Sequence, residues 1–328
     1  MLNPYLKLNK NLFNKEEEKK ATRDGFGKAI MLLGEKNKNV VVLSADLAES
    51  CKVDAFLEKY PNRFIECGVA EQNMAAIAAG LAVSGKIPFI TSFAMFSPGK
   101  NWETIRTSII YNRANVKIAG HHAGIVTGAD GVTHQATEDI SSIRAWPGIN
   151  ILIPCDSIEA EKITLRAASI NGPVYLRFSR EKTPIITTEK TPFSEKIQVF
   201  WTCKNPKTVI FATGHMLYQA LLAAKELEKQ NIDVLVANVS SLKPIDEEEI
   251  VRHVKKTKSA VTCEDHQVEG GLGGIISEIL VQNYPAPVEF IGLKNTFAES
   301  GNAKDLLKKY KMDKNEIVTA VKKVLKRV

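Results

Sequence analysis

Short apolar runs alternate with amphipathic segments through the first half of the chain. The run VVVL at 40–43 is apolar at every position, which is typical of a strand buried on both faces of a parallel sheet. Between such runs, apolar residues recur at helical spacing. This alternation predicts a mainly parallel sheet covered by helices on both faces. The predicted strands are 40–43, 63–66, 87–91, 116–119, 149–153 and 174–178, and the predicted helices include 21–35, 99–111, 138–145 and 158–168.

A second unit of the same kind follows a break in this pattern. The stretch EKTPIITTEKTPFSEK is rich in Thr, Lys and Pro, which indicates a linker. Further strands are predicted at 208–212, 233–239, 259–263 and 288–291. The sequence therefore predicts two three-layer α/β/α domains with mainly parallel sheets. We divide it into a polar arm at 1–20, for which a place on a partner chain is one interpretation, a first domain at 21–182, a linker at 183–206 and a second domain at 207–328.

Composition narrows the function classes. The net charge of +7 would suit anionic partners, but much of the excess lies in the lysine-rich last helix, and no nucleic-acid motif is present. No apolar run is long enough to cross a membrane, and the first residues lack the apolar region of a signal peptide, so we expect a cytoplasmic protein. The five cysteines are scattered without a C-x-x-C pair, which indicates reduced thiols.

The stretch RFIECGVAEQNMAAIAAGLAVSG at 63–85 joins a short strand to a helix of small residues. Glu71 lies in the first turn of that helix, where the helix dipole favours a carboxylate even when it is partly buried. An ordinary glutamate at a helix start has the same pattern. Alone, this position leaves open whether Glu71 is aimed at a ligand.

Candidate chemistry follows the other predicted strands too, and the carboxyl ends of parallel strands are where open α/β sheets place ligands. The loop HHAGIVTGADGVTH is too long and too glycine-rich for a simple turn. Its histidines lack metal-ligand spacing, so we predict no metal site on this chain. Structural roles stay open for these candidates. Phe93 and Phe96 could pack in the core, Asp46 and Ser50 could cap the helix that follows, and Arg180 could form a surface ion pair. In chain order the candidates are Asp46, Ser50, Glu71, Phe93, Phe96, His121, His122, Asp130, His134 and Arg180.

With these residues in order, the chain from residue 21 onward resembles the carboxyl-terminal half of transketolases, and most of all the small subunit of split transketolases. Residues 68–72, GVAEQ, match the motif whose glutamate activates thiamine diphosphate in this family. Phe93 and Phe96 match its aromatic pair on the aminopyrimidine ring, whereas Gly99 stands where a tyrosine is usual. The GVAEQ variant also resembles 2-oxo-acid dehydrogenase β chains and deoxyxylulose-phosphate synthase.

The substrate loop is more discriminating, because transketolases carry two histidines twelve residues apart around Gly-x-Asp-Gly, as in the stretch from His122 to His134. The resemblance implies catalytic roles for Glu71, His134 and His122, and cofactor binding by Glu71, Phe93, Phe96 and Asp46. It implies substrate binding by Arg23, Ser50, His122, Asp130, His134 and Arg180, of which Arg23, Ser50, His122 and Arg180 would bind the phosphate group.

The Gly-Asp-Gly motif that binds Mg²⁺ and the diphosphate in this superfamily does not occur in the sequence. The resemblance therefore implies an amino-terminal partner subunit that supplies the diphosphate and Mg²⁺ site, an α₂β₂ heterotetramer, and thiamine diphosphate shared between chains. It also implies transfer of a glycolaldehyde unit from a ketose phosphate to an aldose phosphate through a thiamine-diphosphate carbanion. The alternatives are a deoxyxylulose-phosphate-synthase-like or 2-oxo-acid dehydrogenase β activity, and a non-catalytic subunit. In the second domain, we expect His215, Glu264 and His266 to serve packing or an interface.

Overall fold

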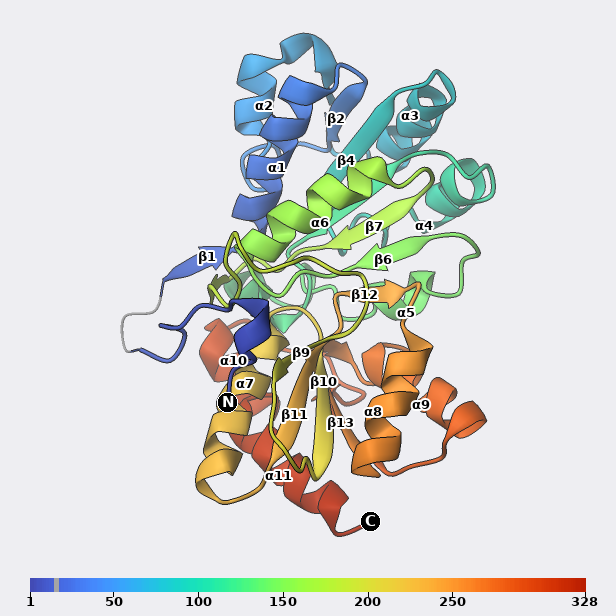
Figure 1. Ribbon diagram of the computed structural model, residues 1–328. Helices are drawn as coiled ribbons and strands as arrows, with labels where there is room; N and C mark the ends of the chain where they lie inside the picture. Colours follow the sequence, from blue (N-terminus) through green and yellow to red (C-terminus); the bar gives the residue numbers. More distant parts are fainter. Residues whose placement is uncertain (15–17) are drawn as a thin grey trace.

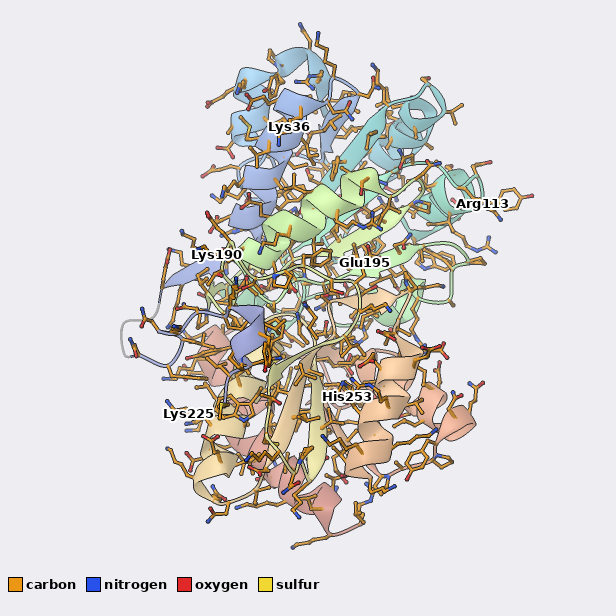
Figure 2. All side chains as sticks on the ribbon, in the orientation of Figure 1. Lys36, Arg113, Lys190, Glu195, Lys225 and His253 are labelled. Atoms are coloured by element: carbon orange, nitrogen blue, oxygen red, sulfur yellow. The ribbon has the colours of Figure 1, made fainter. Side chains whose placement is uncertain are left out.

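Two α/β domains lie end to end in the structure, a computed structural model that describes residues 1–14 and 18–328 (Figure 1). The first domain holds most of the blue and green elements, and the second holds most of the yellow, orange and red ones. Both sheets are mostly parallel, which confirms the predicted fold class. No helix in the described ranges is long and apolar enough to cross a membrane. Charged side chains such as Lys36 and Arg113 project from the outer surface (Figure 2).

The first sheet is buried on both faces, as the run at 40–43 predicts. Val40 and Val42 pack in one core with residues of α1 and α6, whereas Val41 and Leu43 pack in another with residues of α3 and η3. The strands run in the order β12-β6-β7-β5-β4-β2-β3, and all but β12 are parallel. The strands are β2 (Val40–Ser44), β3 (Phe64–Glu66), β4 (Ile87–Phe93), β5 (Lys117–His121), β6 (Asn150–Leu152) and β7 (Val174–Arg177). The helices are α1 (Thr22–Lys36), α2 (Asp54–Lys59), η2 (Pro61–Arg63), α3 (Glu71–Val83), α4 (Trp102–Thr104), η3 (Ile105–Ile110), η4 (Ile125–Asp130), α5 (Asp139–Ile143) and α6 (Ser157–Ser169).

The second sheet has the order β14-β13-β10-β11-β9, with β9 antiparallel to β11 at one edge. Its central strands also alternate between two cores, since Phe211 packs with residues of α8 and α9, and Ile210 with residues of α7 and α11. The strands are β9 (Gln198–Trp201), β10 (Thr208–Ala212), β11 (Val234–Asn238), β13 (Ala260–Gln267) and β14 (Val288–Leu293). The helices are α7 (Met216–Lys229), α8 (Glu247–Thr257), α9 (Leu272–Asn283), α10 (Ala303–Lys309) and α11 (Lys314–Leu325).

The two domains exchange structure at their junction. Strand β12 (Ser241–Lys243) leaves the second domain and pairs antiparallel with β6 at the edge of the first sheet. Lys243 Nζ then donates to the carbonyls of Arg144 and Trp146 at 2.7 and 2.6 Å. In addition, β1 (Lys19–Ala21) pairs antiparallel with β8 (Lys182–Pro184). The sequence pattern did not predict β1, β8, β9 or β12.

The amino-terminal arm packs on its own chain. The amides of Asn3 and Asn9 donate to the carbonyls of Phe200 and Ile186 at 2.8 and 2.9 Å. Leu8 and Leu12, on either side of Asn9, are buried in the core of the second domain. A short helical turn, η1 (Pro4–Leu6), lies between these two contacts. The arm thus ties the expected linker, which contains Ile186 and β9, to the second domain.

The packing of α1 on α6 gives a test of the fold. A Cβ atom on Gly25 of α1 would lie 1.9 Å from the carbonyl oxygen of Ser157, at the start of α6. We expect Gly25→Ala to lower the free energy of unfolding by about 2 kcal/mol, since overpacking forces the helices apart. The matched control is Gly80→Ala in α3, where a Cβ meets nothing within 4 Å. It should raise stability by about 0.5 to 1 kcal/mol. Thermal unfolding of the chain alone measures both, and equal effects would contradict this packing.

Candidate active site at the carboxyl edge of the first sheet

An aromatic and histidine cluster forms where β4 and β5 end. The strands pair in a register that sets Phe93 opposite His121. The next residue, His122, has a φ of 56°, which turns the chain out of the strand, and its ring stacks on Phe93 with the centroids 3.8 Å apart. The ring of Phe96 lies nearly parallel to that of Phe93 at 6.1 Å. His134 meets both phenyl rings edge-on at 6.0 and 5.4 Å, so the structure brings together four of the predicted site residues.

The neighbouring histidine, His121, has a different role. Its ring is fully buried between Phe26 and Phe178, with centroid distances of 4.9 and 5.0 Å. Neither ring nitrogen has a hydrogen-bond partner within the described residues. Burial, reinforced by the nearby His122 and Arg23, lowers the pKa of His121 well below its ordinary value. It is therefore a neutral core residue beneath the site.

Basic groups gather beside the stacked rings. Arg23 Nη1 donates to the carbonyl of Ser50 at 3.0 Å and lies 3.5 Å from His122 Nε2. If Arg23 donates to Nε2, the proton of His122 sits on Nδ1. That atom and Arg23 Nε are buried and have no hydrogen-bond partner within the described part of the chain. Such unpaired polar atoms are costly, and a polar ligand would satisfy them.

Arg23, His122 and Arg180 form a basic corner whose electrostatics keep His122 neutral. Burial, reinforced by the charges of Arg23 and Arg180, lowers the pKa of His122 to about 3. The guanidinium of Arg180 donates to the carbonyl of Thr127 at 2.8 Å and lies 3.9 Å from the carboxylate of Asp130. Arginine side chains suit bidentate binding of phosphate-like anions. The arrangement therefore offers two arginines and a neutral imidazole to an anion.

Glu71 is the first residue of α3, and its side chain is only 2% exposed. Its carboxylate forms an ion pair of 2.8 Å with Lys100 Nζ, and its backbone carbonyl accepts a hydrogen bond of 3.1 Å from the side-chain Nδ2 of Asn101. The loop from Phe96 to Asn101 thus joins the aromatic pair to this carboxylate. The lysine partner was not predicted from the sequence, because its pairing depends on the path of this loop.

Asp46 lies at the end of β2 with a φ of 60° and an exposed side chain. Glu66 Oε1 fixes the turn after β2 by accepting hydrogen bonds from the backbone amides of Asp46 and Gly68 at 2.7 and 2.9 Å. Within the described residues, the carboxylate of Asp46 makes no hydrogen bond to the aromatic cluster. Binding of a cofactor by Asp46 therefore stays a prediction. Glu66, which holds this turn, was not predicted from the sequence.

The aromatic pair and Glu71 could bind the flat ring of an organic cofactor, but the described residues offer no ligand set for a metal ion. Nearly parallel phenyl rings suit the stacking of a flat ring, and a buried carboxylate suits a hydrogen bond to a nitrogen of such a ring. Among the described residues, no group of three or more His, Cys, Asp or Glu side chains is placed to hold a metal ion. The site is therefore suited to a heteroaromatic ring and to the anionic end of a second molecule.

Family models and known relatives match nearly the whole chain. Residues 18–185 match the family model for the transketolase pyrimidine binding domain, and residues 198–317 match that for the transketolase C-terminal domain. A protein of Methanocaldococcus jannaschii named as a transketolase C-terminal section is 40% identical over 315 residues, covering 94% of this chain and 97% of its own. The 6-deoxy-6-sulfo-D-fructose transketolase subunit SqwH of a Clostridium species is 36% identical, covering 93% and 94%. A solved structure described as a split gene transketolase, inactive beta4 tetramer, superposes with a TM-score of 0.86 at 41% identity, covering 93% of this chain and 98% of its own.

The lowered pKa of His122 gives a direct test of the site geometry. A ring that stays neutral when folded but takes up a proton near pH 6.5 when unfolded destabilises the folded chain as the pH falls below 6.5. Because the pKa of His122 is lowered to about 3, we expect its imidazole NMR signals to show no titration between pH 5 and 8. The signals can be assigned by comparison with His122→Gln. An inflection near pH 6.5 would place His122 in solvent and contradict the stacked arrangement.

Proposed function

Because this chain belongs to the transketolase family, we propose that it is the pyrimidine-binding and carboxyl-terminal subunit of a two-chain transketolase. It would transfer a glycolaldehyde unit from a ketose phosphate to an aldose phosphate. One observation carries the proposal: Glu71, the aromatic pair and the anion-binding corner around His122 lie along one edge of one sheet. A non-catalytic subunit has no need for that combination.

The cofactor we propose is thiamine diphosphate, shared with an amino-terminal subunit that binds its diphosphate through Mg²⁺. When bound, it would supply the electron sink for breaking and forming the carbon–carbon bond. Phe93 and Phe96 would stack against its aminopyrimidine ring and exclude water. Glu71 would hold a proton at the ring nitrogen. An α₂β₂ assembly follows if both chains contribute to every site.

Lys100 occupies the position in front of Glu71 in this structure. It neutralises a carboxylate whose burial would otherwise be costly. The lysine side chain is 43% exposed, so it can leave Glu71 for solvent without itself becoming buried. We propose that the aminopyrimidine ring replaces Lys100 as the partner of Glu71.

The substrate would extend from the cofactor toward the basic corner. His134 and Asp130 would contact its hydroxyl groups. Arg23, Arg180, His122 and Ser50 would bind its distal anion, with the unpaired Nδ1 of His122 and Nε of Arg23 as donors. The Clostridium relative is named for a sulfonated ketose, and a sulfonate would meet the same groups. We propose a phosphate because two arginines and a neutral histidine match its dianionic charge.

An assay of the mixed subunits separates this function from the alternatives. With thiamine diphosphate and Mg²⁺, the complex should cleave a ketose phosphate and transfer two carbons to an aldose phosphate. Consumption of pyruvate would instead indicate deoxyxylulose-phosphate-synthase-like or 2-oxo-acid dehydrogenase chemistry. Absence of all three activities would leave the non-catalytic subunit.

Glu71→Gln tests the role of the carboxylate in that assay. Because an amide cannot exchange the proton, we expect kcat to fall by about 100-fold or more, while thermal unfolding of the chain stays cooperative. The matched control is Glu103→Gln, at the start of α4 and exposed. It should keep wild-type kcat. Near wild-type turnover by Glu71→Gln would remove this residue from catalysis.

Arg180→Ala tests the anion-binding corner. Loss of a charged hydrogen-bond donor should raise KM for a phosphorylated acceptor by about tenfold or more, and much less for an unphosphorylated one. Arg166→Ala removes an arginine of α6 that pairs with Glu195 and should change neither value. Equal rises for both acceptors would argue against phosphate binding by Arg180.

A further inference from the structure

The carboxylate of Asp265, in the second domain, reaches into the substrate loop of the first domain, residues 122–134. Asp265 lies in β13 and is 2% exposed. Its Oδ1 accepts from the amide of Ile125 at 2.9 Å, and its Oδ2 accepts from the amide of Val126 at 3.3 Å. His215 Nε2 lies 2.9 Å from the same Oδ2 and holds the carboxylate from its own domain. Three groups therefore fix the orientation of this side chain.

The loop is shaped to receive this carboxylate. Gly124 has a φ of 83°, and a Cβ atom there would lie 2.0 Å from Asp265 Oδ2. Only glycine therefore allows the two segments to approach this closely. The contact depends on residues from both domains, 124 on one side and 265 on the other.

The amides that Asp265 holds begin η4, the turn between His122 and Asp130. Within η4, Thr127 Oγ1 donates to the carbonyl of His122 at 2.5 Å, and the carbonyl of Thr127 accepts from Arg180 at 2.8 Å. A shift of this turn would therefore move three of the groups assigned to substrate binding. On the far side of the loop, Gln135 Nε2 donates to the carbonyl of Glu299 in the second domain at 3.2 Å.

The charge of Asp265 is maintained despite its burial. Burial alone raises the pKa of a carboxyl group, but the hydrogen bond from His215, the charge of Arg177 and the amide of Ile125 together hold the pKa of Asp265 below its ordinary value. Arg177 in turn pairs with Asp139 at 2.8 Å and donates to the carbonyl of Asp265 at 2.9 Å. Hydrogen bonds to an ionised acceptor are the strong ones, so the loop amides are held firmly.

We propose that Asp265, backed by His215, is a positioning residue through which the second domain sets the substrate loop of the active site. The consequence for turnover rests on the proposed transketolase function. The contact itself belongs to this chain alone, so it can be tested without partner or cofactor.

Hydrogen exchange of the chain alone measures the contact. In Asp265→Asn, the amide nitrogen of the new side chain cannot accept from Val126 or from a donating His215. We expect exchange of the peptide covering 124–127 to rise by about tenfold, as for loss of a charged hydrogen bond. Gly124→Ala should reproduce the effect from the loop side. The matched control is Glu264→Gln, because Glu264 is equally buried in the same strand but accepts from Leu272 and Gly273 of its own domain. It should leave this peptide unchanged.

Kinetics of the mixed subunits measure the consequence. A displaced loop weakens binding of the substrate anion and hydroxyls, so Asp265→Asn should raise KM for the phosphorylated acceptor several-fold more than it lowers kcat. Glu264→Gln should change neither, even if it lowers the unfolding temperature as much. Unchanged exchange in Asp265→Asn, faster exchange with an unchanged KM, or the same loop exchange in Glu264→Gln would each overturn the proposal. If the wild-type mixture shows no two-carbon transfer, the proposed function fails, while the exchange results still decide whether Asp265 holds the loop.

Discussion

Parallel pairing of β2, β4, β5 and β7 is the constraint on which the site depends. Because these strands run in one direction, the loops that follow them meet at one edge of the sheet. The register of β4 against β5 then decides the details, since it sets Phe93 beside His121 and lets the next residue stack on the phenyl ring. A slip of one residue would exchange the core histidine for the site histidine.

Polar links join the two domains around that edge. Strand β12 extends the first sheet, Lys243 donates to two carbonyls of the first domain, and Asp265 accepts from two backbone amides of the loop at 122–134. Burying a charge, as at Asp265, is favourable only when its partners are in place. The second domain carries no obvious chemistry of its own. We infer that it contributes by fixing the loop that we propose to bind substrate.

The sequence predicted the parts of the fold that depend on local pattern. Apolar runs located the central strands, because a strand buried on both faces must be apolar throughout. The roles that the family resemblance gives to the site residues stay predictions. The short edge strands β9 and β12 escaped prediction, since their pairing comes from tertiary contacts and not from their own composition. The pairing of Lys100 with Glu71 escaped for the same reason. Asp265 left one signal, a run of three ionisable residues at the end of an apolar stretch, but only the structure shows that Asp265 accepts hydrogen bonds from Ile125 and Val126 of the first domain.

Binding of thiamine diphosphate tests the central claim most directly. Calorimetric titration with the cofactor and Mg²⁺ should be carried out on this chain alone and on its mixture with the diphosphate-binding subunit. We predict tight binding by the mixture and none by the chain alone, because this chain would supply only the ring-binding half of the site. Tight, Mg²⁺-dependent binding by the chain alone would contradict a cofactor shared between two subunits.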